Sequence, residues 1–150
     1  MKINVSRLRK EPGAEESFQF TLAKPEDIGE IKIASPIRVE GKVTNTGNIL
    51  RVTGHISTVV LAACGRCLDD VKIPLELDFT EVYCHESEWD NVTGDPADKN
   101  EFILIREELL DLAIPVKENI ILDMPMKVLC FPGCPGLCPH CGQNLKQGKC

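Results

Sequence analysis

The sequence predicts an α+β domain with an antiparallel β-meander sheet, one short helix in the C-terminal half and a cysteine-rich metal-binding tail. Three stretches between residues 37 and 83 alternate apolar and polar side chains and are joined by short turns, which is typical of antiparallel strands. Residues 112–122 repeat apolar side chains at helical spacing. Seven of the eight cysteines fall into two clusters. The 150 residues suffice for one domain with a hydrophobic core.

The strands of the meander are expected at residues 37–43, 50–63 and 71–83. Apolar side chains take every second position over most of each stretch, so one face of the sheet should be buried and the other polar. Pro74 cannot donate a backbone hydrogen bond, which predicts an open edge or a bulge in the third strand.

We expect a single domain over residues 1–150. Weaker strand patterns occur at 3–8 and 18–22, and residues 101–106 could add a short strand. The expected segments are an N-terminal arm with weak strands (1–30), the antiparallel sheet (31–84), an acidic, mobile loop (85–100), the strand and helix (101–125) and the cysteine-rich zinc tail (126–150).

The helix is expected over residues 112–122, with Asp111 as its N-cap. Pro115 lies in or near the first turn, where its missing N–H matters least. Pro125 follows the end of the helix. The expected apolar face consists of Leu112, Val116 and Ile120, with Ala113 and Ile121 beside it.

The formal net charge of −6 argues against a chain that coats nucleic acid, because affinity for phosphate comes mainly from Lys and Arg. The charges are unevenly spread, since residues 76–111 hold twelve acidic side chains against two basic ones. Such a surface can still offer a basic face to RNA, although solvated acidic and basic faces also explain the pattern. The basic candidates in the N-terminal segment are Arg7, Arg9 and Lys10.

The first ten residues are too charged for a signal peptide, and the longest apolar stretch, residues 59–64, is too short to span a membrane. We therefore expect a cytoplasmic protein without a membrane partner. In a reducing compartment, clustered cysteines serve as metal ligands or redox groups more often than as disulfides. The sequence has no glycine-rich phosphate loop and no catalytic triad spacing, so we expect neither catalysis nor a small-molecule substrate.

The cysteines carry the strongest chemical signal. Cys64 and Cys67 lie in a turn between two strands, and five more cysteines follow the helix. Cys pairs that folding brings together can form a tetrahedral thiolate site, for which zinc is the usual ion. The sequence therefore predicts structural Zn²⁺, one ion or two, with ligands drawn from Cys64, Cys67, Cys130, Cys134, Cys138, Cys141 and Cys150.

The spacing leaves several ligand sets open. The pair Cys64/Cys67 can share an ion with Cys130/Cys134 or with Cys138/Cys141, or the C-terminal cluster can close on itself. The first arrangement leaves an incomplete second knuckle, with His140 as a poorly placed fourth ligand. A redox dithiol is disfavoured because strands flank the first pair, whereas redox motifs open a helix. An iron–sulfur cluster is a further alternative.

Several motifs occur in a fixed order between about residues 35 and 150. They are Cys64-Gly-Arg-Cys67-Leu68, Asp111-Leu112, Glu118, Ile121-Leu122, Pro125, Leu129-Cys130 and the stretch from Gly136 to Leu145. The most specific are the CxRC turn and the Gly-Leu-Cys-Pro-x-Cys-Gly tail. Together and in this order, the motifs resemble those of the bacterial YceD-like family of large ribosomal RNA subunit accumulation proteins, which also has plastid relatives.

The resemblance implies a non-enzymatic role in ribosome biogenesis, supporting the accumulation of large-subunit ribosomal RNA. It favours Cys64, Cys67, Cys130 and Cys134 as one metal site. We expect contact with large-subunit ribosomal RNA, or with a pre-ribosomal protein, through the basic N-terminal segment and Arg66. One alternative is a protein-interaction module whose acidic loop contacts a basic ribosomal protein, and another is a thiol redox protein.

Overall fold

The computed structural model describes residues 1–23, 25–92 and 102–148. Its six-stranded sheet has the order β2-β4-β5-β6-β7 with β3 paired to β5, and a two-stranded sheet joins β1 to β8. The elements are β1 (Lys2–Asn4), η1 (Leu8–Lys10), β2 (Glu15–Leu22), β3 (Lys32–Ile33), β4 (Ile37–Asn45), β5 (Ile49–Ala63), β6 (Asp70–His85), η2 (Glu86–Asn91), β7 (Phe102–Ile105), β8 (Leu109–Asp111) and α1 (Ala113–Leu122).

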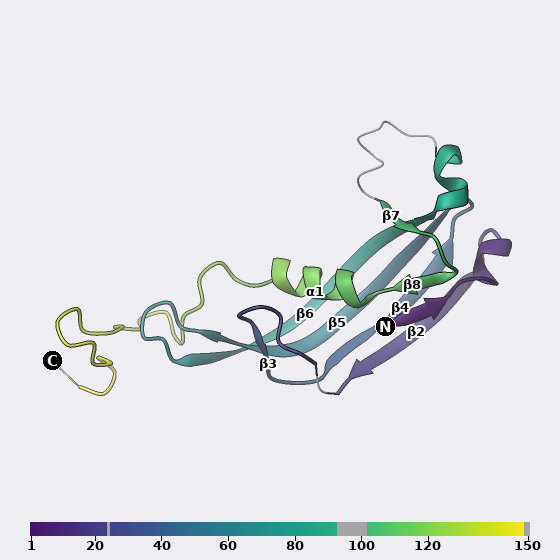
Figure 1. Cartoon of the computed structure of the whole chain (residues 1–150). Helices are drawn as coiled ribbons and strands as arrows, with labels where there is room; N and C mark the ends of the chain where they lie inside the picture. The colour runs from purple at the N-terminus through teal and green to yellow at the C-terminus, as the bar shows by residue number, and fades with distance from the viewer. Residues whose placement is uncertain (24, 93–101, 149–150) are drawn as a thin grey trace.

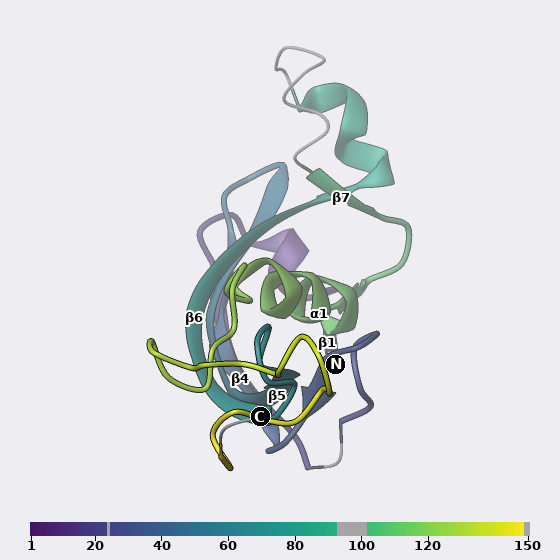
Figure 2. The ribbon, with the colours of Figure 1, turned by 90° about the vertical axis from the view of Figure 1, so that its left-hand side faces the viewer.

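The predicted fold class is confirmed. The meander consists of β4, β5 and β6 in antiparallel register, and the sheet curves around α1 (Figures 1 and 2). Every second side chain of the strands faces the helix, so the side chains of Val43, Val52 and Ile56 are fully buried. This core lies between the concave face of the sheet and the helix.

Pro74 lies opposite Val59 of β5. The backbone of Val59 points away from β6, because its N–H donates to Ser35 Oγ (2.8 Å) and its carbonyl accepts from Ala34 N–H (2.7 Å). The nitrogen of Pro74 therefore also points away from β5. Within the described residues β7 pairs only with Val82 to His85, so the proline lies at an open edge, as predicted.

The edges of the sheet differ from the sequence expectation in three places. The weak pattern at 18–22 is part of the longer strand β2, whereas only Ile3 and Asn4 of the pattern at 3–8 belong to a strand, β1. The short strand expected at 101–106 exists as β7, but it runs parallel to β6. The alternation of side chains defines a strand's faces and carries no information about its direction, so the meander pattern could not reveal this parallel pair.

The expected acidic loop is only partly described. Residues Glu86–Asn91 form the 3₁₀-helix η2, which corrects the prediction of a loop at this point. The His85 side chain accepts a hydrogen bond from Ser87 N–H and so caps the first turn. Residues 93–100 of the predicted loop lie outside the described part of the chain.

The helix α1 occupies nearly the predicted range. Leu112 precedes it without a side-chain cap, and Asp111 belongs to β8, although its carboxylate accepts a hydrogen bond from Ala113 N–H (2.9 Å). Val116 and Ile120 are fully buried as predicted, but Ile121 is 48% exposed because it points away from the sheet. Asn119 links the helix to β6 by donating to Glu81 Oε1 (2.9 Å).

Asn45 fixes the N-terminal arm against the sheet. Its side chain is buried and donates to the carbonyl of Leu8 (2.8 Å), with longer contacts to the carbonyls of Arg9 and Glu11. Its Oδ1 accepts from Gly47 N–H (2.8 Å). The Asn45 amide therefore forms hydrogen bonds with backbone groups both at the end of η1 and in the β4–β5 turn. Without these bonds, buried carbonyl groups would lack partners and the folded state would lose stability.

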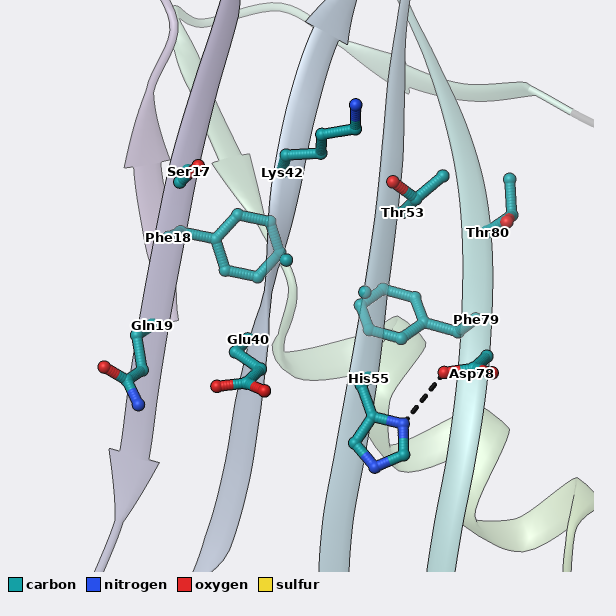
Figure 3. Close-up of a pocket in the computed structure, with 12 residues that line it drawn as sticks. Ser17, Phe18, Gln19, Glu40, Lys42, Thr53, His55, Asp78, Phe79 and Thr80 are labelled. Carbon is teal, nitrogen blue, oxygen red and sulfur yellow. Dashed lines mark hydrogen bonds and ion pairs between the residues drawn. The ribbon is translucent and has the colours of Figure 1, made fainter.

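A row of two glycines between two phenylalanines crosses the middle of the sheet. Phe18, Gly41, Gly54 and Phe79 are direct neighbours on β2, β4, β5 and β6, and Figure 3 shows each ring reaching toward the neighbouring glycine strand. A Cβ on Gly41 would lie 2.2 Å from the Thr53 carbonyl oxygen. The close approach of β4 and β5 therefore requires glycine.

We predict that Gly41→Ala destabilises the protein by about 2 kcal/mol or more, because the added methyl group meets backbone atoms that cannot move independently. Urea unfolding measures the change. Gly133→Ala is the matched control, since its Cβ would meet only the Phe131 ring at 3.7 Å. Equal stability of the two variants would contradict the proposed backbone contact.

Candidate metal centre

The first half of the candidate centre is the turn between β5 and β6. Leu68 N–H donates to the carbonyl of Cys64 (2.9 Å), and Cys64 N–H donates to the carbonyl of Asp69 (2.8 Å). These two bonds close the turn and bring the Cys64 and Cys67 side chains to one side. Leu68 completes the turn in the left-handed region, with φ of 62°, although its side chain is 65% exposed.

The second half comes from the segment after α1. Gly65 N–H donates to the carbonyl of Val128 (2.8 Å), and Cys130 N–H approaches Cys64 Sγ at 3.5 Å. These contacts place Cys130 and Cys134 beside the turn. The segment reaches this position because it runs from the end of α1 back along the hairpin to its tip (Figure 1).

The four sulfur atoms of Cys64, Cys67, Cys130 and Cys134 all lie within 4.8 Å of one another. The Sγ atoms of Cys67 and Cys130 are 3.7 Å apart, and those of Cys64 and Cys134 are 3.9 Å apart. A tetrahedron with Zn–S distances of about 2.3 Å has sulfur atoms about 3.8 Å apart. The arrangement is therefore compatible with zinc.

The thiols of the cluster differ in acidity. Backbone N–H groups of Cys67 and Arg66 donate to Cys64 Sγ and lower the pKa of Cys64 to about 6, despite its burial. Burial raises the pKa of Cys134 to about 12. At neutral pH the pocket therefore already favours a thiolate at Cys64, which is the form that binds metal.

Polar side chains hold the two halves together. Arg66 donates to the Cys134 carbonyl (2.8 Å). Lys146 is ion-paired with Asp69 and approaches Cys130 Sγ at 3.5 Å, and Asp69 also accepts from Asn144 (3.2 Å). Sequence reasoning did not identify Asp69, Asn144 or Lys146. No spacing rule marks them, because their contacts span more than 70 residues of sequence.

The turn at Cys138 repeats the geometry of the first turn. Gly142 N–H donates to the Cys138 carbonyl (2.9 Å), Cys138 N–H donates to the Gln143 carbonyl (2.8 Å), and Gly142 has φ of 73°. Cys138 is buried and Cys141 is exposed. Neither belongs to the four-sulfur cluster found among the described residues, and Cys150 lies outside the described part of the chain.

The basic residues considered for RNA contact fall into two groups. Arg9 is ion-paired with Glu108 and donates to Ser87 Oγ (3.2 Å), so it joins the N-terminal arm to the rest of the domain. Arg7 and Lys10 are exposed and form no ion pair within the described residues. Arg66 is exposed but already bound to Cys134. Two of the candidates thus have structural contacts.

A second site, a shallow hollow of about 810 Å³, lies over the glycine row (Figure 3). Within the lining His55 contacts Asp78 (2.8 Å), while Glu76 and Glu15, which lie outside it, contact His55 (3.0 Å) and Lys42 (3.0 Å). The bonds to Asp78 and Glu76 raise the pKa of His55. Within the described residues the His55 ring contacts only these two carboxylates.

We predict that Leu68→Gly stabilises the protein by about 1 kcal/mol, because glycine adopts a positive φ without the steric cost that a leucine bears. Little burial is lost, since the leucine is 65% exposed. The midpoint of thermal unfolding measures the change. Leu68→Ala retains the backbone cost while it removes the side chain, so a gain in both variants would assign the effect to the side chain instead.

Comparison with known proteins finds related chains in bacteria and plants. An uncharacterised protein of Mycobacterium tuberculosis is 29% identical over 149 residues, which cover 97% of this chain and 70% of the relative. The uncharacterised protein YlbN of Bacillus subtilis is 26% identical over 133 residues, covering 87% of this chain and 74% of YlbN. No solved structure matches the chain significantly.

A plant relative carries a functional name. The chloroplastic large ribosomal RNA subunit accumulation protein YCED homolog 1 of Arabidopsis thaliana is 22% identical over 180 residues, covering 99% of this chain and 54% of the plant protein. None of the described helices has the length and apolar character needed to cross a membrane. A family model described as large ribosomal RNA subunit accumulation protein YceD matches residues 52–150, and the chain therefore belongs to the YceD family.

Proposed function

We propose that this protein is a non-enzymatic factor that supports the accumulation of large-subunit ribosomal RNA in the bacterial cytoplasm. The family match over residues 52–150 carries this proposal, and the family description names no reaction. The match begins inside β5 and includes every cysteine of the chain. The part of the chain shared with the family therefore contains the candidate metal centre.

In this proposal a structural zinc ion is bound by Cys64, Cys67, Cys130 and Cys134. The sulfur separations and the burial of the site support this ligand set. The ion would join the tip of the β5–β6 hairpin to the segment after α1, so its binding free energy would contribute to folding. Cys138 and Cys141, in a turn of the same backbone geometry, would provide two ligands of a second site, and Cys150 would provide a third.

In this proposal contact with RNA would be made by basic side chains. Of the three N-terminal candidates, Arg7 and Lys10 remain available, since Arg9 is ion-paired. Arg66 keeps exposed surface beside the metal centre. Contact with a pre-ribosomal protein is the alternative, and an apolar groove described below favours it.

The described segments would act together as a single domain.

We predict that protein purified without added metal contains at least one zinc ion per chain, and that Cys134→Ser loses one ion and unfolds at a lower temperature. Elemental analysis and thermal unfolding measure these effects. Cys84→Ser is the matched control, because Cys84 is equally buried but lies outside the four-sulfur cluster. A second zinc that persists in Cys134→Ser would indicate a separate site at Cys138 and Cys141.

A metal-free wild-type protein whose thiols oxidise readily in pairs would contradict the zinc assignment and favour the redox alternative. The cellular role requires a separate measurement. Depletion of the protein from its own cells should lower the ratio of large-subunit to small-subunit ribosomal RNA, and the wild-type gene should restore it. An unchanged ratio after complete depletion would contradict the proposed role even if zinc is present.

A further inference from the structure

A cavity of about 600 Å³ lies between β7 and the beginning of α1, far along β6 from the cysteine cluster. Its lining is largely apolar and includes the side chains of Leu104, Leu109 and Ile114, which are 42%, 37% and 65% exposed. Three large apolar side chains open to solvent around one cavity indicate a binding surface. Because its residues lie outside the cysteine cluster, this surface has no part in the candidate metal centre.

The cavity runs along the edge of a strand. Ile103, Leu104 and Ile105 are consecutive, and all three line it. Successive side chains of a strand point to opposite faces, so a cavity that touches all three follows the strand edge. β7 is the last strand of its sheet, and no described strand pairs with its outer side. Alternate peptide groups of β7 are therefore available to an added strand.

The charges around the cavity favour a basic occupant. Of the charged lining residues, Arg106 faces Glu86 at 3.5 Å, and Asp111 faces the N-terminal amine at 3.7 Å. Glu107 and Glu118 are exposed and form no ion pair within the described residues, and Lys2 is the one cation of the lining that is likewise unpaired there. The rim therefore carries an excess of unpaired carboxylates beside the apolar floor.

We propose that this groove binds an extended segment of a partner protein in which apolar residues alternate with Lys or Arg. The segment would add a strand to the outer edge of β7, with its backbone hydrogen-bonded to the strand. Its apolar side chains, which share one face of the added strand, would pack on Ile114 at the helix, and its basic side chains would face the exposed carboxylates of the rim, Glu107 among them. The site is distinct from the metal centre, and its occupancy does not depend on the proposed ribosomal role.

The test uses the full-length protein and an acetylated, amidated probe peptide, Lys-Val-Lys-Ile-Lys-Val-Lys. Titration followed by backbone amide NMR should shift the signals of β7 and the first turn of α1. Two further peptides have the same sequence, but each carries N-methyl groups on every second residue, so that the N–H groups of one strand edge are removed. The peptide methylated on the edge that faces β7 should bind at least tenfold more weakly, because it cannot donate hydrogen bonds to the strand. A peptide with Glu in place of Lys should not bind.

Matched variants distinguish binding in the groove from nonspecific binding to other surfaces. Ile114→Ser should weaken binding about tenfold, whereas Leu122→Ser should not, although Leu122 is an exposed residue of the same helix. Glu107→Lys should weaken binding, and Glu16→Lys on β2 should leave it unchanged. All four sites are exposed, so the variants are expected to fold.

Three outcomes would overturn the proposal: equal binding of the acidic peptide, insensitivity to N-methylation on both edges, or shifts confined to other surfaces. Binding of a single-stranded RNA oligonucleotide at the same groove, in competition with the peptide, would assign the surface to RNA instead. The peptide experiment and the depletion experiment can also give different answers. If the peptide binds as expected but depletion leaves ribosomal RNA unchanged, the groove inference holds and the proposed cellular role is refuted.

Discussion

The closure of the β5–β6 hairpin tip against the segment after α1 is the contact on which the C-terminal part of the structure depends. The hydrophobic core lies between the concave sheet and α1, whereas the tip has only a small cluster centred on Cys64, Cys67 and Cys134. So few apolar side chains cannot order a segment that lacks helix or strand, because each residue fixed costs about 1–2 kcal/mol of conformational entropy. The buried sulfur atoms, the Arg66 bond to the Cys134 carbonyl and the Lys146–Asp69 pair supply the additional attraction. A metal ion on the four thiolates would contribute more than all of these together.

Curvature is the second constraint. A long β5–β6 hairpin with a flat sheet would leave α1 packed against one narrow line of side chains. The glycine row instead lets β4 and β5 approach closely, and the rings of Phe18 and Phe79 fill the space that two missing side chains leave. The sheet can then wrap around the helix and bury Val116 and Ile120 completely. At the end of the sheet β7 pairs with only four residues of β6, and the groove lies beside this short strand.

The sequence predicted what depends on local pattern and missed what depends on distant contact. Alternation located β4, β5 and β6, helical spacing located α1, and the missing N–H of Pro74 located the open edge. The direction of β7, the pairing of β1 with β8 and the short strand β3 could not be predicted, since each is set by a partner far away in sequence. At the candidate centre the cysteine spacing left three ligand sets open; the family resemblance favoured the set with Cys130 and Cys134, and the fold brings these two to the first pair. Arg9 and Arg66 were singled out by their charge, and the sequence could not show that both also make internal contacts.

The two surfaces of interest lie at opposite ends of one strand. β6 starts next to the cysteine turn, and its last four residues pair with β7 beside the groove. The strand between them, residues 70–82, spans at most about 40 Å. Substitutions at such separated sites usually act independently. Loss of the metal would release the hairpin tip and the tail, but it would leave the core around Val52 and Ile56 and the pairing of β7 in place. A protein with this layout can therefore use one end to hold its own fold together and the other to engage a partner, so effects on partner binding and on metal content can be assigned to separate ends of the molecule.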